Sequence, residues 1–131
     1  MSRDSAARST LYEKLLVDYD QMFPPVGDVA AGVARWIDCG DGWHHLIDGL
    51  LGCIDWYATI DPGVQRPIIV RIKEKHGTLR IQFRRPPTWL MAMAAYAEEL
   101  STRTCEVCGA IGQQHQGGRR QAGRPPTNLK P

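Results

Sequence analysis

The most regular pattern of apolar and polar positions lies in residues 66–84. Two runs alternate with a period of two residues on either side of a short polar turn at residues 74–77, and this pattern predicts a β-hairpin. The apolar face is expected to carry Ile68, Val70, Ile72, Leu79, Ile81 and Phe83. The opposite face is expected to carry Ile69, Arg71, Lys73, Thr78, Arg80, Gln82 and Arg84. An isolated hairpin is only marginally stable in water, so other elements must cover the apolar face.

Residues 41–57 show the clearest helical periodicity and are the best partner for the hairpin. Their wide apolar stripe consists of Trp43, Leu46, Ile47, Leu50, Leu51, Ile54 and Tyr57, which fall on one side of a helix. Asp41 is placed to cap this helix. The preceding residues 24–41 contain several glycines and could hold a short strand or a helical turn; we expect a loop there.

Two further helices are predicted on either side of these elements. Thr10 and Glu13 form a capping-box pattern, which is followed by the apolar stripe Leu11, Leu15, Tyr19 and Met22 and ends before Pro24. Thr88 is placed to cap a helix that ends near Arg103. Its apolar stripe is Leu90, Met93, Ala97 and Leu100, flanked by Trp89 and Tyr96.

Together these elements predict one α+β domain over residues 10–112. Three helices would pack on a small antiparallel sheet, with two strands or slightly more, and a cysteine knuckle at residues 104–109 would follow. Residues 1–9 are expected to form a flexible N-terminus. Residues 113–131 are rich in Gln, Gly, Arg and Pro, and we expect a disordered basic tail because they offer almost no apolar surface to bury.

The formal charge of +2 over 131 residues conceals an asymmetry between the two halves of the chain. Residues 1–63 carry 4 Lys and Arg against 10 Asp and Glu, whereas residues 64–131 carry 12 against 4. Either the two halves attract each other across the core, or the basic half faces an acidic partner, which would be nucleic acid or an acidic protein.

The polar face of the hairpin is the candidate binding site for such a partner. Arg71, Lys73, Arg80 and Arg84 would project from one side of the sheet and repel each other unless a negative group lies on them. Phosphate, an acidic protein surface or the acidic half of the chain would serve. The absence of an aromatic residue from this face disfavours a platform for stacking single-stranded bases.

Cys105 and Cys108, followed by Gly109, form the strongest chemical motif. Two thiolates at this spacing are half of a structural zinc site. The remaining Cys and His donors, which include Cys39, Cys53, His76 and His115, do not follow a characteristic spacing. The alternatives are therefore a zinc knuckle and a metal-free pair of reduced thiols, and the missing second cysteine pair favours the latter.

No catalytic motif is present in the sequence. His44 and Asp48 share a helix face, next to His45, and could bind a metal or transfer a proton, but that face is opposite the apolar stripe, so we expect exposed surface residues. His76 is expected to be a turn residue. We therefore predict a protein that is not an enzyme, with a small metalloenzyme as the least favoured alternative.

The N-terminal residues contain no apolar stretch of the kind found in secretory signals, and no window approaches about 20 apolar residues. These features predict a cytoplasmic protein with reduced cysteines that does not span a membrane.

The segments CGDGW at residues 39–43, KEKHGTLR at residues 73–80 and TCEVCG at residues 104–109 occur in this order. With them, residues 11–109 resemble a group of small phage and prophage proteins of unknown function. Members of that group often continue into a second cysteine pair, which implies a zinc ribbon, whereas this chain continues into a Gly, Arg and Pro tail. His76 stands where the group usually has Phe, and the pair His44 and His45 is not part of its pattern.

The resemblance implies an accessory protein in the cytoplasm of a bacterial host cell. Our first hypothesis is that it binds a host protein, with inhibition of a host defence system as one candidate role. The alternative is a nucleic-acid-associated module that uses the basic hairpin face and the tail. Neither hypothesis defines the partner or the oligomeric state.

Overall fold

The predicted hairpin is the centre of the structure. The computed structural model describes residues 2–24 and 29–112, in which β2 (Ile69–Lys75) and β3 (Thr78–Phe83) pair antiparallel. His76 and Gly77 connect them with φ angles of 54° and 80°, the combination that a two-residue type I′ turn requires. Glu74 Oε2 accepts a hydrogen bond from Gly77 N at 2.8 Å. His76 is therefore a turn residue, as the sequence predicted.

A third strand makes the sheet mixed rather than purely antiparallel. β1 (Ile37–Asp38) lies parallel to β2, with Ile37 opposite Ile72 and Asp38 opposite Lys73. β1 follows α2 (Val29–Trp36), so residues 29–38, expected to be a loop, hold a helix and a strand. A parallel pair needs a long crossover connection, and α3 (His44–Ile60) provides it. The α+β fold class is confirmed, with these two elements added.

A β-bulge changes which residues of the first hairpin strand face the core. The pairing between β2 and β3 shifts between Ile69 and Arg71, because a bulge inserts one extra residue into one strand. Ile69 is consequently 0% exposed and Val70 is 42% exposed, the reverse of the strict alternation that we predicted. Ile72, Leu79, Ile81 and Phe83 are buried as expected.

The three predicted helices form, with different starting points. α1 (Ser2–Asp18) begins well before Thr10, which is therefore inside the helix and not at its cap. Asp41 belongs to a short 3-10 turn, η2 (Asp41–Trp43), that precedes α3. α4 (Thr88–Ser101) has Pro87 at its N-cap position, so Thr88 is its first helical residue. Another 3-10 turn, η1 (Asp20–Met22), follows α1.

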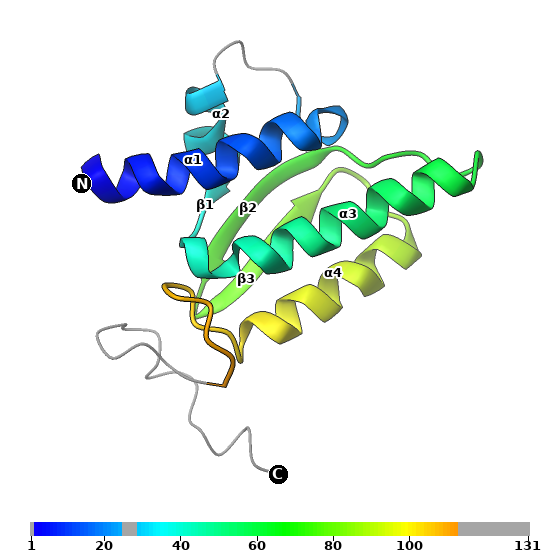
Figure 1. Cartoon of the computed structure of the whole chain (residues 1–131). Helices are drawn as coiled ribbons and strands as arrows, with labels where there is room; N and C mark the ends of the chain where they lie inside the picture. The colour runs from blue at the N-terminus through cyan, green and yellow to red at the C-terminus, as the bar shows by residue number, and fades with distance from the viewer. Residues whose placement is uncertain (1, 25–28, 113–131) are drawn as a thin grey trace.

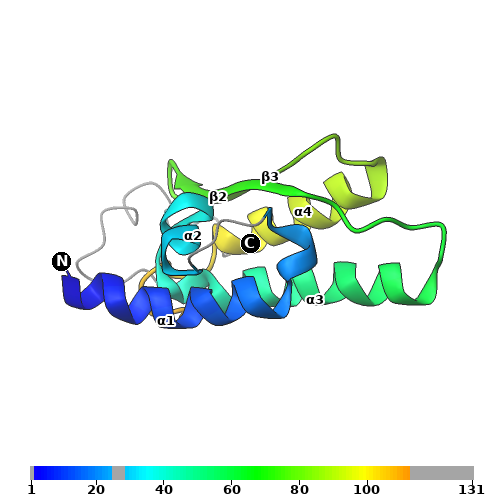
Figure 2. The ribbon, with the colours of Figure 1, turned by 90° about the horizontal axis from the view of Figure 1, so that it is seen from above.

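The helices lie on one side of the sheet. In Figure 2, α1 and α3 lie below β2 and β3, and α4 slants from the level of the strands toward the same side. The opposite side of these strands is not covered by any described helix (Figures 1 and 2). α2 contacts α1 as well as β1 and β2. The apolar face of the hairpin is therefore buried under helices, while its basic face stays open.

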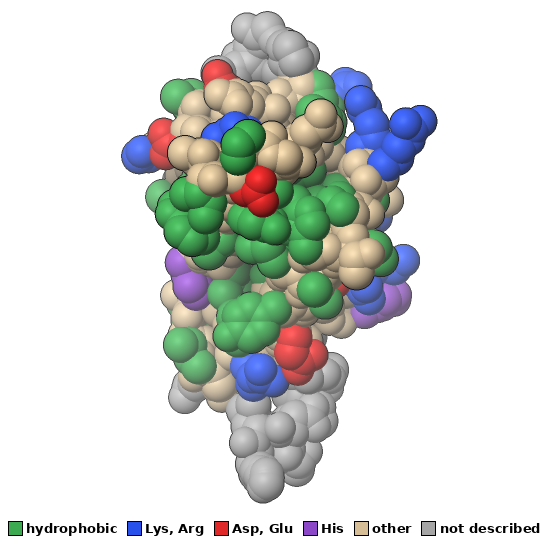
Figure 3. Space-filling view, turned by 90° about the vertical axis from the view of Figure 1, so that its right-hand side faces the viewer, with side chains coloured by type: hydrophobic (Ala, Val, Ile, Leu, Met, Phe, Trp, Pro, Cys, Tyr) green, Lys and Arg blue, Asp and Glu red, His purple; other side chains and the backbone are tan. Residues whose placement is uncertain are grey.

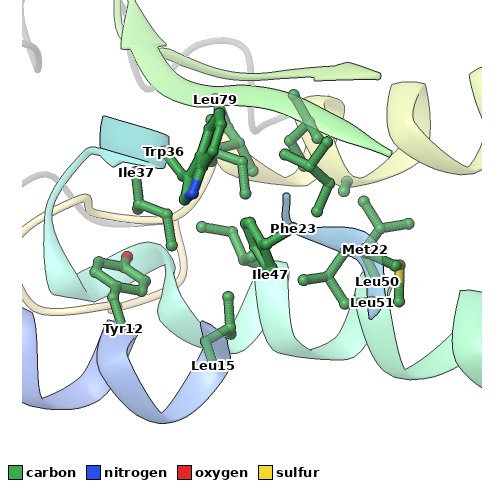
Figure 4. Close-up of a cluster of buried hydrophobic side chains, with 14 of the residues drawn as sticks. Tyr12, Leu15, Met22, Phe23, Trp36, Ile37, Ile47, Leu50, Leu51 and Leu79 are labelled. Atoms are coloured by element: carbon green, nitrogen blue, oxygen red, sulfur yellow. The ribbon is translucent and has the colours of Figure 1, made fainter. Parts of the chain in front are cut away.

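The core lies between the sheet and the helices, where side chains from distant parts of the sequence meet (Figure 4). Its fully buried members include Tyr12, Leu15, Met22, Trp43, Ile47, Leu51, Ile54, Ile69, Ile72, Leu79 and Leu90. Full burial of each large apolar side chain contributes roughly 1.5–3 kcal/mol. The predicted apolar stripe over residues 41–57 supplies four of these residues to the core. The helix that packs most closely on the hairpin is α4, which lies against β3, so the prediction that residues 41–57 are its best partner is not confirmed.

No helix in the described ranges is both long enough and apolar enough to cross a membrane. The predicted tail at residues 113–131 lies outside the described residues, and the side chains of the predicted flexible N-terminus at residues 1–9 are also outside them.

Candidate functional site

The open face of the hairpin gathers three of the four predicted binding residues around one surface depression. Arg71, Lys73 and Arg80 line it together with Lys75 and Gln82, and its volume is about 260 Å³. We call this set of five residues the cationic depression. Lys75 and Gln82 were not among the predicted site residues, although their positions on alternating strands could have identified them.

Arg84 does not line the cationic depression. β3 ends at Phe83, and the Arg84 backbone N–H donates to Ile68 O at 2.9 Å where the chain leaves the sheet. The structure therefore does not place Arg84 beside the other three predicted residues, because the alternation on which the prediction rests ends one residue earlier, at Phe83. Arg84 remains exposed and is useful as a control.

The register brings like charges together. Lys73 is directly opposite Arg80, and Arg71 is directly opposite Gln82. Directly opposed side chains lie about 5 Å apart at their Cβ atoms, and like charges at that separation destabilise a sheet. Within the part of the chain that the structure describes, Lys73, Lys75 and Arg80 make no salt bridge. A negative partner would relieve this repulsion.

One carboxylate borders the cationic depression. Asp38 on β1 lies next to Lys73 in the sheet, and its Oδ2 is 3.5 Å from Arg71 Nη2. Both side chains are substantially exposed, so this ion pair contributes at most about 1 kcal/mol. Arg71 Nε is buried and has no hydrogen-bond partner among the described residues. Among the described residues, the acidic half of the chain therefore neutralises the basic face at one edge only.

Two other distinctive segments, residues 39–43 and residues 104–109, pack against each other. Gly42 N donates to Glu106 O at 2.6 Å, and Gly40 N donates to Glu106 Oε2 at 2.7 Å. Trp43 Nε1 donates to Thr104 O at 2.9 Å from within the core. We call this contact the glycine–knuckle contact. It joins the start of α3 to the segment that follows α4.

Tyr12 of α1 supports the same contact from the other side. Its hydroxyl donates to Gly40 O at 2.7 Å and lies 3.6 Å from Cys39 Sγ. Burial and the neighbouring Cys39 raise the pKa of Tyr12 well above its usual range. The phenol therefore remains a neutral donor at physiological pH, and residues 39–43 have a structural role that links three parts of the chain.

The two cysteines of the knuckle differ in environment. Cys105 is buried and Cys108 is exposed. Their segment is held by hydrogen bonds from Gly109 N to Cys105 O at 2.8 Å and from Cys105 N to Ala110 O at 2.9 Å. Across residues 2–24 and 29–112, no three Cys, His, Asp or Glu side chains form a group that could hold a metal ion. His115 lies outside the described residues.

Because Cys105 is buried and Cys108 is exposed, serine substitutions at the two positions distinguish the zinc site from the metal-free pair. Without a metal, Cys105→Ser is expected to lower the free energy of unfolding by about 1 kcal/mol, because it puts a hydroxyl in a buried site, whereas Cys108→Ser should have almost no effect. With a zinc site, both variants would lose metal and both would be destabilised. Metal analysis and urea unfolding of the purified variants measure the two outcomes.

The two histidines at the start of α3 lie in different environments. The His44 ring is half-buried and lies 5.6 Å from the Tyr12 ring, while His45 is exposed. Asp48 Oδ1 accepts a hydrogen bond from the Tyr19 hydroxyl at 3.0 Å, and partial burial together with this bond raises the pKa of Tyr19 to about 12. The expectation that His44 and Asp48 are simply exposed is thus wrong, because α1 packs against this side of α3.

Comparison of the chain with protein-family models, with curated proteins and with solved structures finds no significant match. The resemblance to phage and prophage proteins therefore stays a prediction, and the function must be inferred from the surface of the molecule itself.

Proposed function

We propose that this chain is a non-enzymatic binding protein whose cationic depression docks on an acidic surface of another protein. The observation that carries the proposal is the open sheet face itself, on which Arg71, Lys73, Lys75 and Arg80 surround one depression on rigid strands. Following the predicted phage or prophage origin, the partner would be a host protein, and inhibition of a host defence system is one role that such binding could serve.

The surroundings of the cationic depression favour a protein over nucleic acid. Asp38 stands at its edge beside Arg71, where its carboxylate would repel a phosphate backbone but could pair with a basic side chain of a protein partner. No aromatic residue lies among the residues that line the depression, so bases have no ring to stack on. A protein surface with an acidic centre and a mixed rim fits this arrangement.

Nucleic acid is the second candidate, because the same four cations could contact successive phosphates. The salt dependence of the binding affinity distinguishes a nucleic-acid partner from a protein partner. Contacts to four phosphates would weaken duplex DNA binding about 100-fold between 50 and 200 mM salt. Binding to a protein of defined shape should weaken much less, because apolar and hydrogen-bonded contacts contribute to it.

Two charge reversals, one inside the cationic depression and one just after the end of β3, test the site. Arg80→Glu is expected to weaken binding of an acidic peptide, for example a Glu-rich 12-mer, by about tenfold or more, because it puts a repulsive charge at the centre of the depression. Arg84→Glu changes the net charge equally but lies outside the depression, and it should have a much smaller effect. Fluorescence titration measures both.

Equal losses in the two variants would show a non-specific response to net charge and would contradict the proposed site. Tighter binding of duplex DNA or RNA than of the acidic peptide, with the steep salt dependence above, would favour the nucleic-acid alternative.

A further inference from the structure

The β-bulge of β2 turns an apolar side chain away from the core, next to the cationic depression. Ile69 is opposite Phe83 and Arg71 is opposite Gln82, so Val70 is the extra residue that the bulge inserts between these pairs. Ile69 is fully buried and Val70 is 42% exposed. The side chain of Val70 therefore points away from the core, as does that of Arg71, which lines the depression.

The bulge brings this apolar group closer to the cations than a regular strand would. Under strict alternation from Ile72, the nearest apolar residue on the open face of β2 would be Ile69, two residues from Arg71. The bulge replaces it with Val70, which adjoins Arg71 and is nearer by one residue, about 3.3 Å along the strand. Val70 is the only exposed large hydrophobic residue of β2 and β3. Bulges occur often beside functional sites, where they re-aim a side chain in this way.

The edge of β3 is already occupied by α4, which limits how a partner can approach. β3 is the last strand in the sheet order β1-β2-β3. Leu79 N donates to Ser101 Oγ at 2.9 Å. Ile81 N donates to Glu98 Oε2 at 3.1 Å. These side chains of α4 accept the hydrogen bonds that a strand added beside β3 would need, so a partner reaches the cationic depression through side chains on the open face.

The combination of charge and apolar surface on this face defines what it can select. Attraction between exposed charges is screened by salt and discriminates weakly between acidic segments. An apolar side chain at a fixed place beside the charges adds a contact that salt does not screen, and that only a segment with a matching apolar residue can make. Val70 and Arg71 are neighbours on a paired strand, so this spacing is fixed by the backbone.

We propose that Val70 determines the specificity of the open face. Acidic side chains of the partner lie in the cationic depression, and one large apolar side chain next to them packs on Val70. The inference rests on the proposed function and deepens it, because it defines the partner segment as an acidic one that contains a residue such as Leu, Ile, Met or Phe.

Other exposed apolar side chains lack this charged setting. Hydrophobic side chains gather on the side of the molecule where α3 ends and α4 begins (Figure 3). In α3, Trp56 and Ile60 are exposed, and neither lines the cationic depression. Ile60 is 55% exposed and is a branched aliphatic residue like Val70, which makes it the matched control.

Two acidic peptides test the inference on the full chain. Both are Glu-rich 12-mers, and they differ only at one central position, which is Leu in one peptide and Ser in the other. The Leu peptide is expected to bind the parent chain about fivefold more tightly, because its apolar side chain and Val70 leave water together. This ratio should be similar at 50 and 200 mM salt, although both affinities fall, since salt screens only the charges. Fluorescence titration with labelled peptides measures the affinities.

Matched variants locate the apolar contact. Val70→Thr keeps the branched shape but replaces a methyl group with a hydroxyl, and it should reduce the preference for the Leu peptide to less than about twofold, because the hydroxyl prefers to stay hydrated. Val70→Ile should keep the preference. Ile60→Thr removes apolar surface outside the open face and should leave the preference unchanged. Circular dichroism checks that each variant is folded.

The outcomes distinguish failure of this inference from failure of the proposed function. If Arg80→Glu weakens binding of both peptides, the cationic depression is a binding site. In that case, equal binding of the two peptides by the parent chain, a full preference retained in Val70→Thr, or an equal loss of preference in Ile60→Thr would each overturn the role of Val70. If neither peptide binds, or if Arg80→Glu binds both as tightly as the parent chain, the proposed function fails and the role of Val70 fails with it.

Discussion

Ile69→Asp is expected to abolish cooperative folding, whereas Val70→Asp is expected to leave the domain folded. Ile69 is fully buried and Val70 is 42% exposed, so only the first change puts an unpaired charge into the core. A buried, unpaired carboxylate costs several kcal/mol, which is comparable to the whole stability of a small domain, about 5–15 kcal/mol. Thermal unfolding followed by circular dichroism compares the two neighbouring variants directly.

The same pair of variants, Ile69→Asp and Val70→Asp, tests whether β2 contains the β-bulge. Under strict alternation from Ile72, Val70 would face the core and Ile69 would face water. A folded Ile69→Asp variant together with an unfolded Val70→Asp variant would therefore show that β2 is regular and that the register shift is absent.

Gly42→Ala is expected to destabilise the domain by about 3 kcal/mol, a large effect for one added methyl group. A Cβ atom at position 42 would lie 2.1 Å from Cys105 O and 2.5 Å from Glu106 O. Both are backbone atoms, and Cys105 O already accepts a hydrogen bond from Gly109 N, so the glycine–knuckle contact must open. Overpacking of this kind costs about 1–3 kcal/mol, and the loss of the bond from Gly42 N to Glu106 O adds about 1 kcal/mol. Urea unfolding measures the change.

Gly49→Ala is the matched control, because it adds the same methyl group in open space. It should stabilise the domain by about 0.5–1 kcal/mol, since Gly49 lies inside α3 and alanine is the better helix former. If both variants were equally destabilised, the close approach of residues 39–43 to residues 104–109 would not exist in solution.

Local periodicity explains which parts of the fold could be predicted from the sequence. The hairpin and α3 were predictable because their alternating and helical patterns extend over many residues. The two-residue strand β1 was not, because Ile37 and Asp38 are too few to show alternation, and their strand is defined by pairing with Ile72 and Lys73. The bulge at Val70 was also missed, because it depends on the facing strand.

The candidate site was likewise predictable only where it depends on local alternation along the strands. Arg71, Lys73 and Arg80 were predictable because they alternate on paired strands, while Asp38 at the rim comes from a strand that the sequence did not reveal. The role of residues 39–43 and 104–109 depends on a contact between segments more than 60 residues apart along the chain.

The most direct test of binding through the cationic depression is capture of host proteins from nuclease-treated bacterial lysate by the parent chain, Arg80→Glu and Arg84→Glu. We expect a defined protein to be retained by the parent chain and by Arg84→Glu, to be lost with Arg80→Glu, and to bind the purified parent chain directly. Retention of the same protein by all three chains, or loss of all retained material after nuclease treatment, would contradict binding of an acidic host protein at this face.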